Sequence, residues 1–345
     1  MKSQKNIKRK IRKRTRKRNK KNIMGGSNSK NIEKKIFNNC SKTWYGFEIN
    51  RNKKKYHTYI NKLLRVAQKL LPCGIPSGEI KAVLTPHAGI GSSGLGAASA
   101  YCSLLGSNNH IKRVIILSTF HSGRDGIFIP DIHSFYNCGR KLKMDSEAVQ
   151  FLKNQSNPNI RIIPVSNKKK IGTQSETQSG ILDEMINEHS IEMQLPFLQN
   201  VLNYKKVKFL PIFVGKIAKK DIKIIANIIE EVGNKEKNND SLWVINTDFL
   251  HIDTAKGNHY KNKIPNRNIT NEIARIVSSF SLEVLNVTPT SYDNISATNK
   301  KYKNPRPAIC GLNALKLWCK TDLAQQLYGT ISSYYTSYHN NLKHM

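Results

Sequence analysis

The chain has 345 residues, of which 57 are Lys or Arg and 23 are Asp or Glu, so its formal net charge is +34. Hydrophobic residues make up 38% of the sequence, which is enough for a sizeable core and excludes a chain that is disordered throughout. No apolar run approaches the roughly 20 residues of a membrane span, and no apolar stretch follows the charged N-terminus as in a secretory signal. We therefore expect an intracellular, cytoplasmic protein with no membrane span.

The six cysteines lie at irregular spacings and form no C-x-x-C motif. This pattern is typical of neither a zinc finger nor a disulfide framework. It suits a reducing compartment, in agreement with the expected intracellular location.

The positive charge is concentrated at the N-terminus, where residues 1–21 contain 13 Lys or Arg and no acidic residue. Self-repulsion and a shortage of apolar side chains prevent such a segment from packing. We predict that residues 1–36 form a disordered basic arm. The arm has two interpretations: a nuclear-localisation or nucleic-acid-binding tail, centred on residues 1–21, or a solvated segment with no specific partner.

Short apolar, β-branched runs alternate with segments of helical spacing along the rest of the chain. Continuous runs of this kind are typical of strands that are buried on both faces. The polar segment 166–187 is predicted to be a long, mobile loop. The predicted helices are 56–71, 93–105, 145–154, 190–204, 218–232, 266–285 and 311–328, and the predicted strands are 82–84, 114–117, 160–165, 207–214 and 242–245.

The alternation of strand and helix predicts an α/β fold with a mostly parallel central sheet that is flanked by helices. We expect residues 37–345 to form one domain, with the polar segment 166–187 as an insertion in it. The sequence contains no internal repeat.

Several predicted strands are followed directly by a residue that can bind a metal or move a proton. His87, His121, Asp248 and His251 occupy such positions. Because ligand sites of open α/β sheets lie beyond the carboxyl ends of the strands, we expect these four residues to share one site. Taken singly, each has an ordinary alternative, as a solvated loop residue or as a helix cap.

Six sequence blocks resemble the Memo family and occur in the same order. The most specific is E-H-S-I-E-M-Q-L-P, which begins at Glu188. The resemblance covers roughly residues 40–330 and leaves the basic arm outside it. The blocks are A-V-L-T-P-H-A-G (82–89), R-V-I-I-L-S-T-F-H (113–121), E-H-S-I-E-M-Q-L-P-F-L (188–198), F-L-P-I-F-V-G (209–215), I-N-T-D-F-L-H (245–251) and I-C-G (309–311).

The resemblance implies a fold like that of the class III extradiol dioxygenases and a pocket that binds copper or iron. The metal-ligand positions of the family fall on His87, His121 and Cys310. The resemblance also assigns catalytic positions to two further residues, Asp248 and His251, with His251 as the general acid or base of an enzyme.

Glu188 and His189 match the E-H of the most specific block and are further pocket candidates. Other positions depart from the family pattern. Ser122 stands where family members usually have the second His of S-H-H, and Asn313 stands where they have the His of C-G-R-H-P. The ligand positions are retained, whereas neighbouring histidines that could position a substrate or move protons are lost.

Three functions are consistent with these residues. The favoured one is a metal-binding, signalling-type protein with a protein or peptide partner and little or no dioxygenase activity. The first alternative is a mononuclear metal-dependent oxidoreductase of the extradiol-dioxygenase type. The second alternative is a nucleic-acid-associated protein that binds, and enters the nucleus, through residues 1–21.

Overall fold

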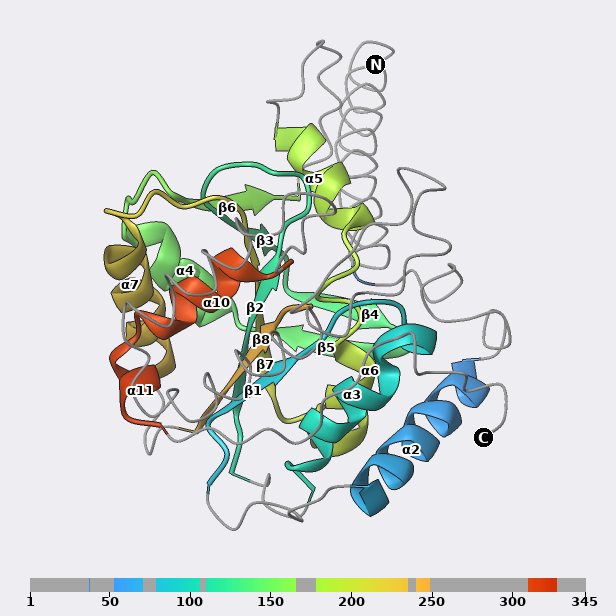
Figure 1. Ribbon diagram of the computed structural model, residues 1–345. Coiled ribbons are helices and arrows are strands. Elements are labelled where there is room, and N and C mark those ends of the chain that lie inside the picture. The colour runs from blue at the N-terminus through green and yellow to red at the C-terminus, as the bar shows by residue number, and fades with distance from the viewer. Residues whose placement is uncertain are drawn as a thin grey trace, which may run out of the picture.

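The computed structural model describes residue 37 and residues 53–70, 79–105, 110–165, 178–234, 240–248 and 310–327. Helices and strands alternate along most of this part of the chain (Figure 1). The elements are α2 (Lys53–Leu70), β1 (Ala82–Thr85), α3 (Ile90–Cys102), β2 (Arg113–Thr119), β3 (Ile127–Asp131), β4 (Ser134–Asn137), β5 (Arg140–Met144), α4 (Ser146–Asn154), β6 (Ile160–Pro164), α5 (Gln178–Asn187), α6 (Leu195–Val201), β7 (Lys208–Val214), α7 (Ile222–Asn234), β8 (Ser241–Asn246), α10 (Leu312–Cys319) and α11 (Asp322–Gln325).

A mixed sheet with the strand order β1-β8-β2-β7-β3-β6 runs through the centre. Its pairs are parallel except for β3 with β7, and β5 adds a parallel contact to β7 while it pairs antiparallel with β4. Every residue of β2 and β8 is buried, as their continuous apolar runs predict. The predicted α/β fold with a mostly parallel sheet is therefore confirmed.

Helices cover both faces of the sheet (Figure 1). α3 and α6 lie on one side, with α2 packed outside them, and α4, α7 and α10 lie on the other side. α7 is amphipathic and buries Ile222, Ile225 and Ile229 on the face that meets the core. None of the helices in the described residues is long and apolar enough to cross a membrane.

The structure differs from the sequence prediction mainly in three places, and the helix predicted over 190–204 is shorter, since α6 begins only at Leu195. Strands β3, β4 and β5 were not predicted, because they are short and the β4–β5 turn uses Cys138 at a positive φ instead of the usual Asn. Residues 178–187 of the predicted loop form α5, since Ile181, Leu182 and Met185 supply a helical apolar face. The predicted helix 311–328 is two helices, because the Thr321 side chain caps α11.

Other predictions lie outside the described residues: the basic arm 1–36, residues 166–177 of the insertion and the helix 266–285. The cysteines give one further correction. Cys138 is disulfide-bonded, whereas Cys102, Cys310 and Cys319 are free thiols. The spacing of the cysteines did not indicate this bond, because disulfide pairing depends on proximity in the fold.

A buried ion pair connects the sheet to α4 and α7. Arg113 of β2 donates from Nε to Asp145 Oδ2 and from Nη1 to the Val232 carbonyl oxygen, 2.6 Å away. Asp145 also caps α4, because its Oδ1 accepts from the Ala148 N–H at 3.1 Å. Only 2% of Arg113 and 0% of Asp145 is exposed, so each charge depends on the other for compensation.

We predict that Asp145→Ala lowers the free energy of unfolding by about 3–5 kcal/mol, because it leaves the buried Arg113 charge unpaired and removes a helix cap. Chemical denaturation measures this loss. Glu147→Ala is the matched control: Glu147 lies on the same helix and pairs with Lys208, but it is exposed, and its loss is expected to cost less than about 1 kcal/mol.

The double variant Arg113→Met/Asp145→Ala separates the cost of the unpaired charge from the cost of the lost helix cap. Without Arg113 no unpaired charge remains, so the double variant is expected to be more stable than Asp145→Ala alone. Equal or lower stability of the double variant would contradict a role for charge compensation.

Candidate metal centre

Three polar residues follow the carboxyl ends of three neighbouring parallel strands. β1, β8 and β2 are adjacent in the sheet. His87, Asp248 and His121 each lie two positions beyond the last residue of β1, β8 and β2, respectively. Their common spacing and the parallel pairing of the strands bring all three to the same edge of the sheet.

Cys310 lies at the same edge of the sheet, two residues before the first residue of α10. Its backbone N–H donates to the Asp248 carbonyl oxygen at 3.0 Å, and the next N–H, of Gly311, donates to Thr247 Oγ1 at 3.0 Å. A Cβ on Gly311 would lie 2.3 Å from the Asn246 carbonyl oxygen, so only glycine permits this approach. The start of α10 is thus fixed against the end of β8.

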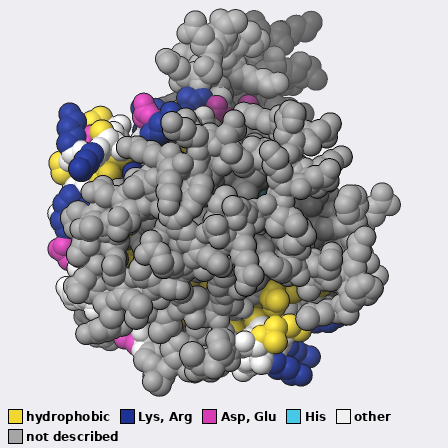
Figure 2. Space-filling view, viewed as in Figure 1, with side chains coloured by type: hydrophobic (Ala, Val, Ile, Leu, Met, Phe, Trp, Pro, Cys, Tyr) yellow, Lys and Arg dark blue, Asp and Glu magenta, His cyan; other side chains and the backbone are white. Residues whose placement is uncertain are grey.

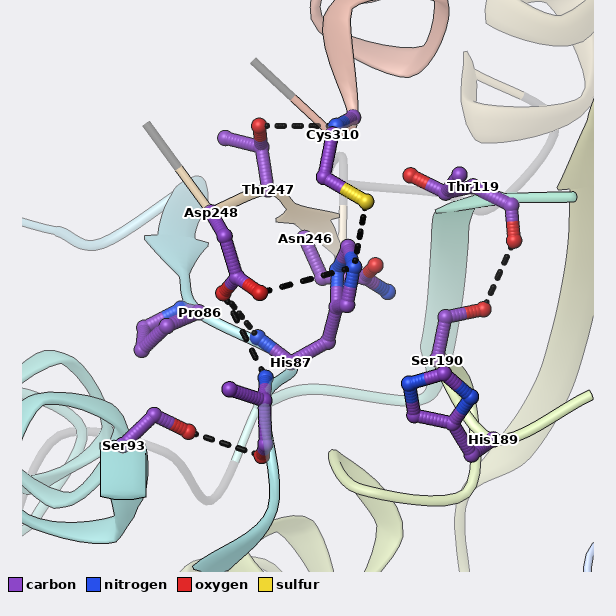
Figure 3. Close-up of polar contacts among 12 residues, drawn as sticks. Pro86, His87, Ser93, Thr119, His189, Ser190, Asn246, Thr247, Asp248 and Cys310 are labelled. Carbon is purple, nitrogen blue, oxygen red and sulfur yellow. Dashed lines mark hydrogen bonds and ion pairs between the residues drawn. The ribbon is translucent and has the colours of Figure 1, made fainter. Parts of the chain in front are cut away.

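The Cys310 thiol lies between the two histidines. Its Sγ is 2.9 Å from His121 Nε2 and 3.3 Å from His87 Nε2, and the two imidazole rings are perpendicular, with centroids 5.3 Å apart. Figure 3 shows Cys310 directed at His87, with Asp248 and His189 on either side. One donor atom from each of His87, His121 and Cys310 lies within 4.8 Å of the other two, so these atoms could hold one ion.

The donor atoms fit a transition metal. Two imidazole nitrogens and a thiolate are the ligands that copper(I) favours, and imidazole also suits iron. His87 is fully buried, Cys310 is intermediate and the side chain of His121 is 35% exposed. The exposure of the three ligand residues thus increases from His87 to His121, so an ion can approach from the solvent on the His121 side.

Glu188 lies behind His121, in the segment between α5 and α6. Its Oε1 and Oε2 lie 2.9 and 3.0 Å from His121 Nδ1, and Oε2 also accepts from the His121 backbone N–H at 2.8 Å. Oε1 accepts from the N–H groups of His189 and Ser190 at 2.8 and 3.0 Å. This buried carboxylate thus joins the α5–α6 segment to the end of β2.

Opposing effects set the pKa values of this cluster. Burial disfavours the imidazolium of His121, but hydrogen bonds to Cys310 and Glu188 and the charges of both outweigh it and raise the pKa of His121 to about 10. Burial also opposes ionisation of Glu188, but His121 holds the pKa of this carboxyl at about 2. Burial lowers the pKa of His189 to about 4, so this ring, stacked on His121 with centroids 5.0 Å apart, is neutral at pH 7.

Asp248 holds the backbone of His87 as Glu188 holds that of His121. Its Oδ1 accepts from the N–H groups of His87 and Ala88 at 2.9 and 3.3 Å, and its Oδ2 is 3.8 Å from His87 Nε2. Asp248 therefore lies beside the three donors and positions one of them. His251, the other residue with an expected catalytic position, lies outside the described residues.

The sequence did not indicate several residues that support the site. Ser190 Oγ donates to the Thr119 carbonyl oxygen at 2.7 Å and ties the α5–α6 segment to β2. Thr247 and Gly311 fix the start of α10, as described above. Thr247 and Gly311 lie within the matching blocks, but their roles depend on contacts between distant segments, which spacing alone does not reveal.

A family model described as Memo-like protein matches residues 43–340. The chain belongs to the Memo-like family. The predicted family is therefore confirmed, over nearly the same range as the sequence blocks indicated.

Individual relatives agree with this membership. The chain is 26% identical over 216 residues to MEMO1 family protein MHO1 of Saccharomyces cerevisiae, which covers 61% of this chain and 57% of the yeast protein. It is 25% identical over 239 residues to Protein memo-1 homolog of Caenorhabditis elegans, covering 69% of this chain and 60% of the worm protein. The chain thus spans less than two thirds of the length of these relatives.

Among solved structures, the chain is similar to the uncharacterized protein JW3007 from Escherichia coli K12. The TM-score is 0.42 at 10% sequence identity, and the match covers 70% of this chain and 88% of the bacterial chain.

We predict that Gly311→Ala displaces the start of α10 from β8, because the added methyl group would overlap the Asn246 carbonyl oxygen. Overpacking of this kind costs about 1–3 kcal/mol. Thermal unfolding is expected to show this loss, and copper(I) titration is expected to show weaker binding, since Cys310 moves with Gly311.

Gly91→Ala is the control for this substitution. Gly91 lies on an exposed face of α3, with nothing within 4 Å of an added Cβ, so alanine is expected to leave stability unchanged or to raise it slightly. If Gly311→Ala unfolded at the wild-type temperature and bound copper equally well, the close approach would not position Cys310.

Proposed function

We propose that this protein binds one copper or iron ion through His87, His121 and Cys310 and acts as a metal-binding, signalling-type protein. The observation that carries the proposal is the convergence of two Nε2 atoms on one thiol, at 2.9 and 3.3 Å. Membership of the Memo-like family supports it as well. The resemblance of the sequence blocks to that family implies metal ligands at these three positions.

The donor set favours copper(I) over iron. Thiolate and imidazole are well matched to a polarizable monovalent ion, whereas iron in oxygenases is usually bound by two histidines and a carboxylate. A bound copper ion would supply one-electron redox chemistry. The protein's own residues provide the ligands, hold them through Asp248 and Glu188, and leave the His121 side open to solvent.

Little or no dioxygenase activity is expected. Ser122 and Asn313 occupy positions where the family usually has histidines. Proton transfer by a positioned side chain typically contributes about 10²–10⁴ in rate, so the loss of such groups can silence an enzyme without abolishing metal binding. The alternative is a metal-dependent oxidoreductase of the extradiol-dioxygenase type, in which Asp248 and His251 are catalytic.

We predict that Cys310→Ser weakens copper(I) binding at least about 100-fold, because a neutral hydroxyl replaces a soft anionic ligand. Competition titration with a copper(I) chelator measures the change. The matched control is Cys319→Ala, which removes a buried thiol at the opposite end of α10 and is expected to leave the affinity unchanged.

Two further results would decide between the alternatives. His87→Ala/His121→Ala should abolish binding, and metal analysis of the protein purified without chelator tests this. Iron-loaded protein should consume little oxygen with catechols; robust ring cleavage that depends on His251 would establish the oxidoreductase instead. Unchanged copper affinity in Cys310→Ser would remove this residue from the site.

The signalling role, with a protein or peptide as partner, rests on family membership alone.

A nucleic-acid partner is the second alternative, and the 13 basic residues among residues 1–21 favour it. On the face shown in Figure 2, the visible Lys and Arg side chains of the described residues lie in separate groups at the margins, some beside Asp or Glu. The support for the nucleic-acid alternative is the charge of the N-terminal segment.

If this alternative holds, RNA or DNA affinity is expected to fall steeply with salt and to be lost on deletion of residues 1–36. A protein that contacts 6–10 phosphates loses about 10³–10⁵ in affinity between 50 and 200 mM salt. Fluorescence anisotropy with a labelled oligonucleotide measures both effects. Binding that persists after the deletion would locate the interface on the folded domain.

A further inference from the structure

Glu188 has a complete set of hydrogen-bond donors within the protein. The carboxylate is only 5% exposed. Three backbone N–H groups, those of His121, His189 and Ser190, donate to it, and the His121 Nδ1 atom lies 2.9 and 3.0 Å from its two oxygens. A carboxylate offers about four lone-pair sites, and these four N–H groups occupy them.

This arrangement argues against a second way of binding a metal. His121, Glu188 and His189 also bring donor atoms within 4.8 Å of one another, as a metal site would. An ion bound there through His121 Nδ1, the ring nitrogen beside Glu188, would have to displace backbone N–H groups from Glu188 and use the lone pair of that nitrogen. A neutral imidazole has only one free lone pair, and His121 Nε2 already faces Cys310.

We propose that Glu188 is a positioning residue that fixes His121 as the Nδ1–H tautomer once the ring has lost its Nε2 proton to bind the metal. With the proton on Nδ1, the lone pair of Nε2 points at the ion that His87 and Cys310 share. This inference rests on the proposed metal-binding function. A carboxylate behind a ligating histidine fixes the orientation of the ring and increases its basicity as a ligand.

The two histidines are not held alike, and this asymmetry makes the inference testable. Both donate their backbone N–H to a carboxylate, His121 to Glu188 and His87 to Asp248. Of the two rings, only that of His121 has a carboxylate from the described residues at its distal nitrogen. Within the described part of the chain, the buried Nδ1 of His87 has no hydrogen-bond partner. Loss of the Glu188 charge should therefore affect His121 and leave the His87 ring unchanged.

The test is Glu188→Gln in the full-length protein, which keeps the shape of the side chain but removes its charge. Copper(I) affinity, measured by competition titration, is expected to fall 10–100-fold, as is typical when the outer partner of a ligating histidine is lost. Glu184→Gln is the matched control. Glu184 lies on α5 and pairs with Arg124 instead of with a donor residue, so its substitution should not change the affinity.

A spectroscopic measurement distinguishes positioning from a merely structural role. Copper(I) is diamagnetic, so ¹⁵N NMR of the loaded protein can identify which ring nitrogen carries the proton. In the wild type, we expect His121 to carry it on Nδ1 and to bind metal through Nε2. In Glu188→Gln, the His121 signals should shift or divide between tautomers while those of His87 stay in place. A purely structural residue would lower the melting temperature without this selective change.

The results of these experiments separate the role of Glu188 from metal binding itself. Wild-type protein in which His121 binds copper through Nδ1 would overturn the role of Glu188, even if Glu188→Gln failed to fold. Wild-type affinity and an unchanged His121 tautomer in Glu188→Gln would overturn it as well, while the metal site itself stood. Wild-type protein that bound neither copper nor iron would overturn both the proposed function and this inference.

Discussion

The candidate centre depends on the parallel register of β1, β8 and β2. Thr85 pairs with Asn246, and Leu117 pairs with Ile245, so the three strands end almost level at the edge of the sheet. A slip of one residue would turn each strand's side chains to the opposite face. Because β2 and β8 are buried along their whole length, such a slip would place different side chains against the close-packed helices on both sides, and this packing maintains the register. The hydrophobic core thus aligns the polar residues that follow the strands.

Around this edge the local charge opposes the overall charge. The chain carries a formal net charge of +34, yet the groups that surround the two histidines are Asp248, Glu188 and the Cys310 thiol. Each carboxylate accepts hydrogen bonds from backbone N–H groups, which compensate in part for its removal from water. The composition of a protein therefore says little about the electrostatics of its site, which these few contacts determine.

The sequence predicted the fold class and the strand-end positions, because buried parallel strands have a continuous apolar pattern and polar residues directly follow them. It could not predict that β8 lies between β1 and β2, because strand order depends on packing and not on local pattern. It gave no sign that Gly311 must lack a side chain, since that requirement comes from the Asn246 carbonyl oxygen of a distant segment. The hairpin of β4 and β5 was missed for a local reason, its unusual Cys138-Gly139 turn.

The hydrogen bond from the Cys310 N–H to the Asp248 carbonyl oxygen also bears on how members of this family can diverge in length. Asp248 and Cys310, which flank segment 249–309, are held directly against each other by this bond. For a flexible connection, the entropy of bringing its two ends together increases only with the logarithm of its length, so doubling the length costs about 0.6 kcal/mol. A family member with a flexible connection of another length between β8 and α10 could therefore keep this contact at small thermodynamic cost. The position of the thiol is set by its two anchoring hydrogen bonds and is independent of the length of the chain between them.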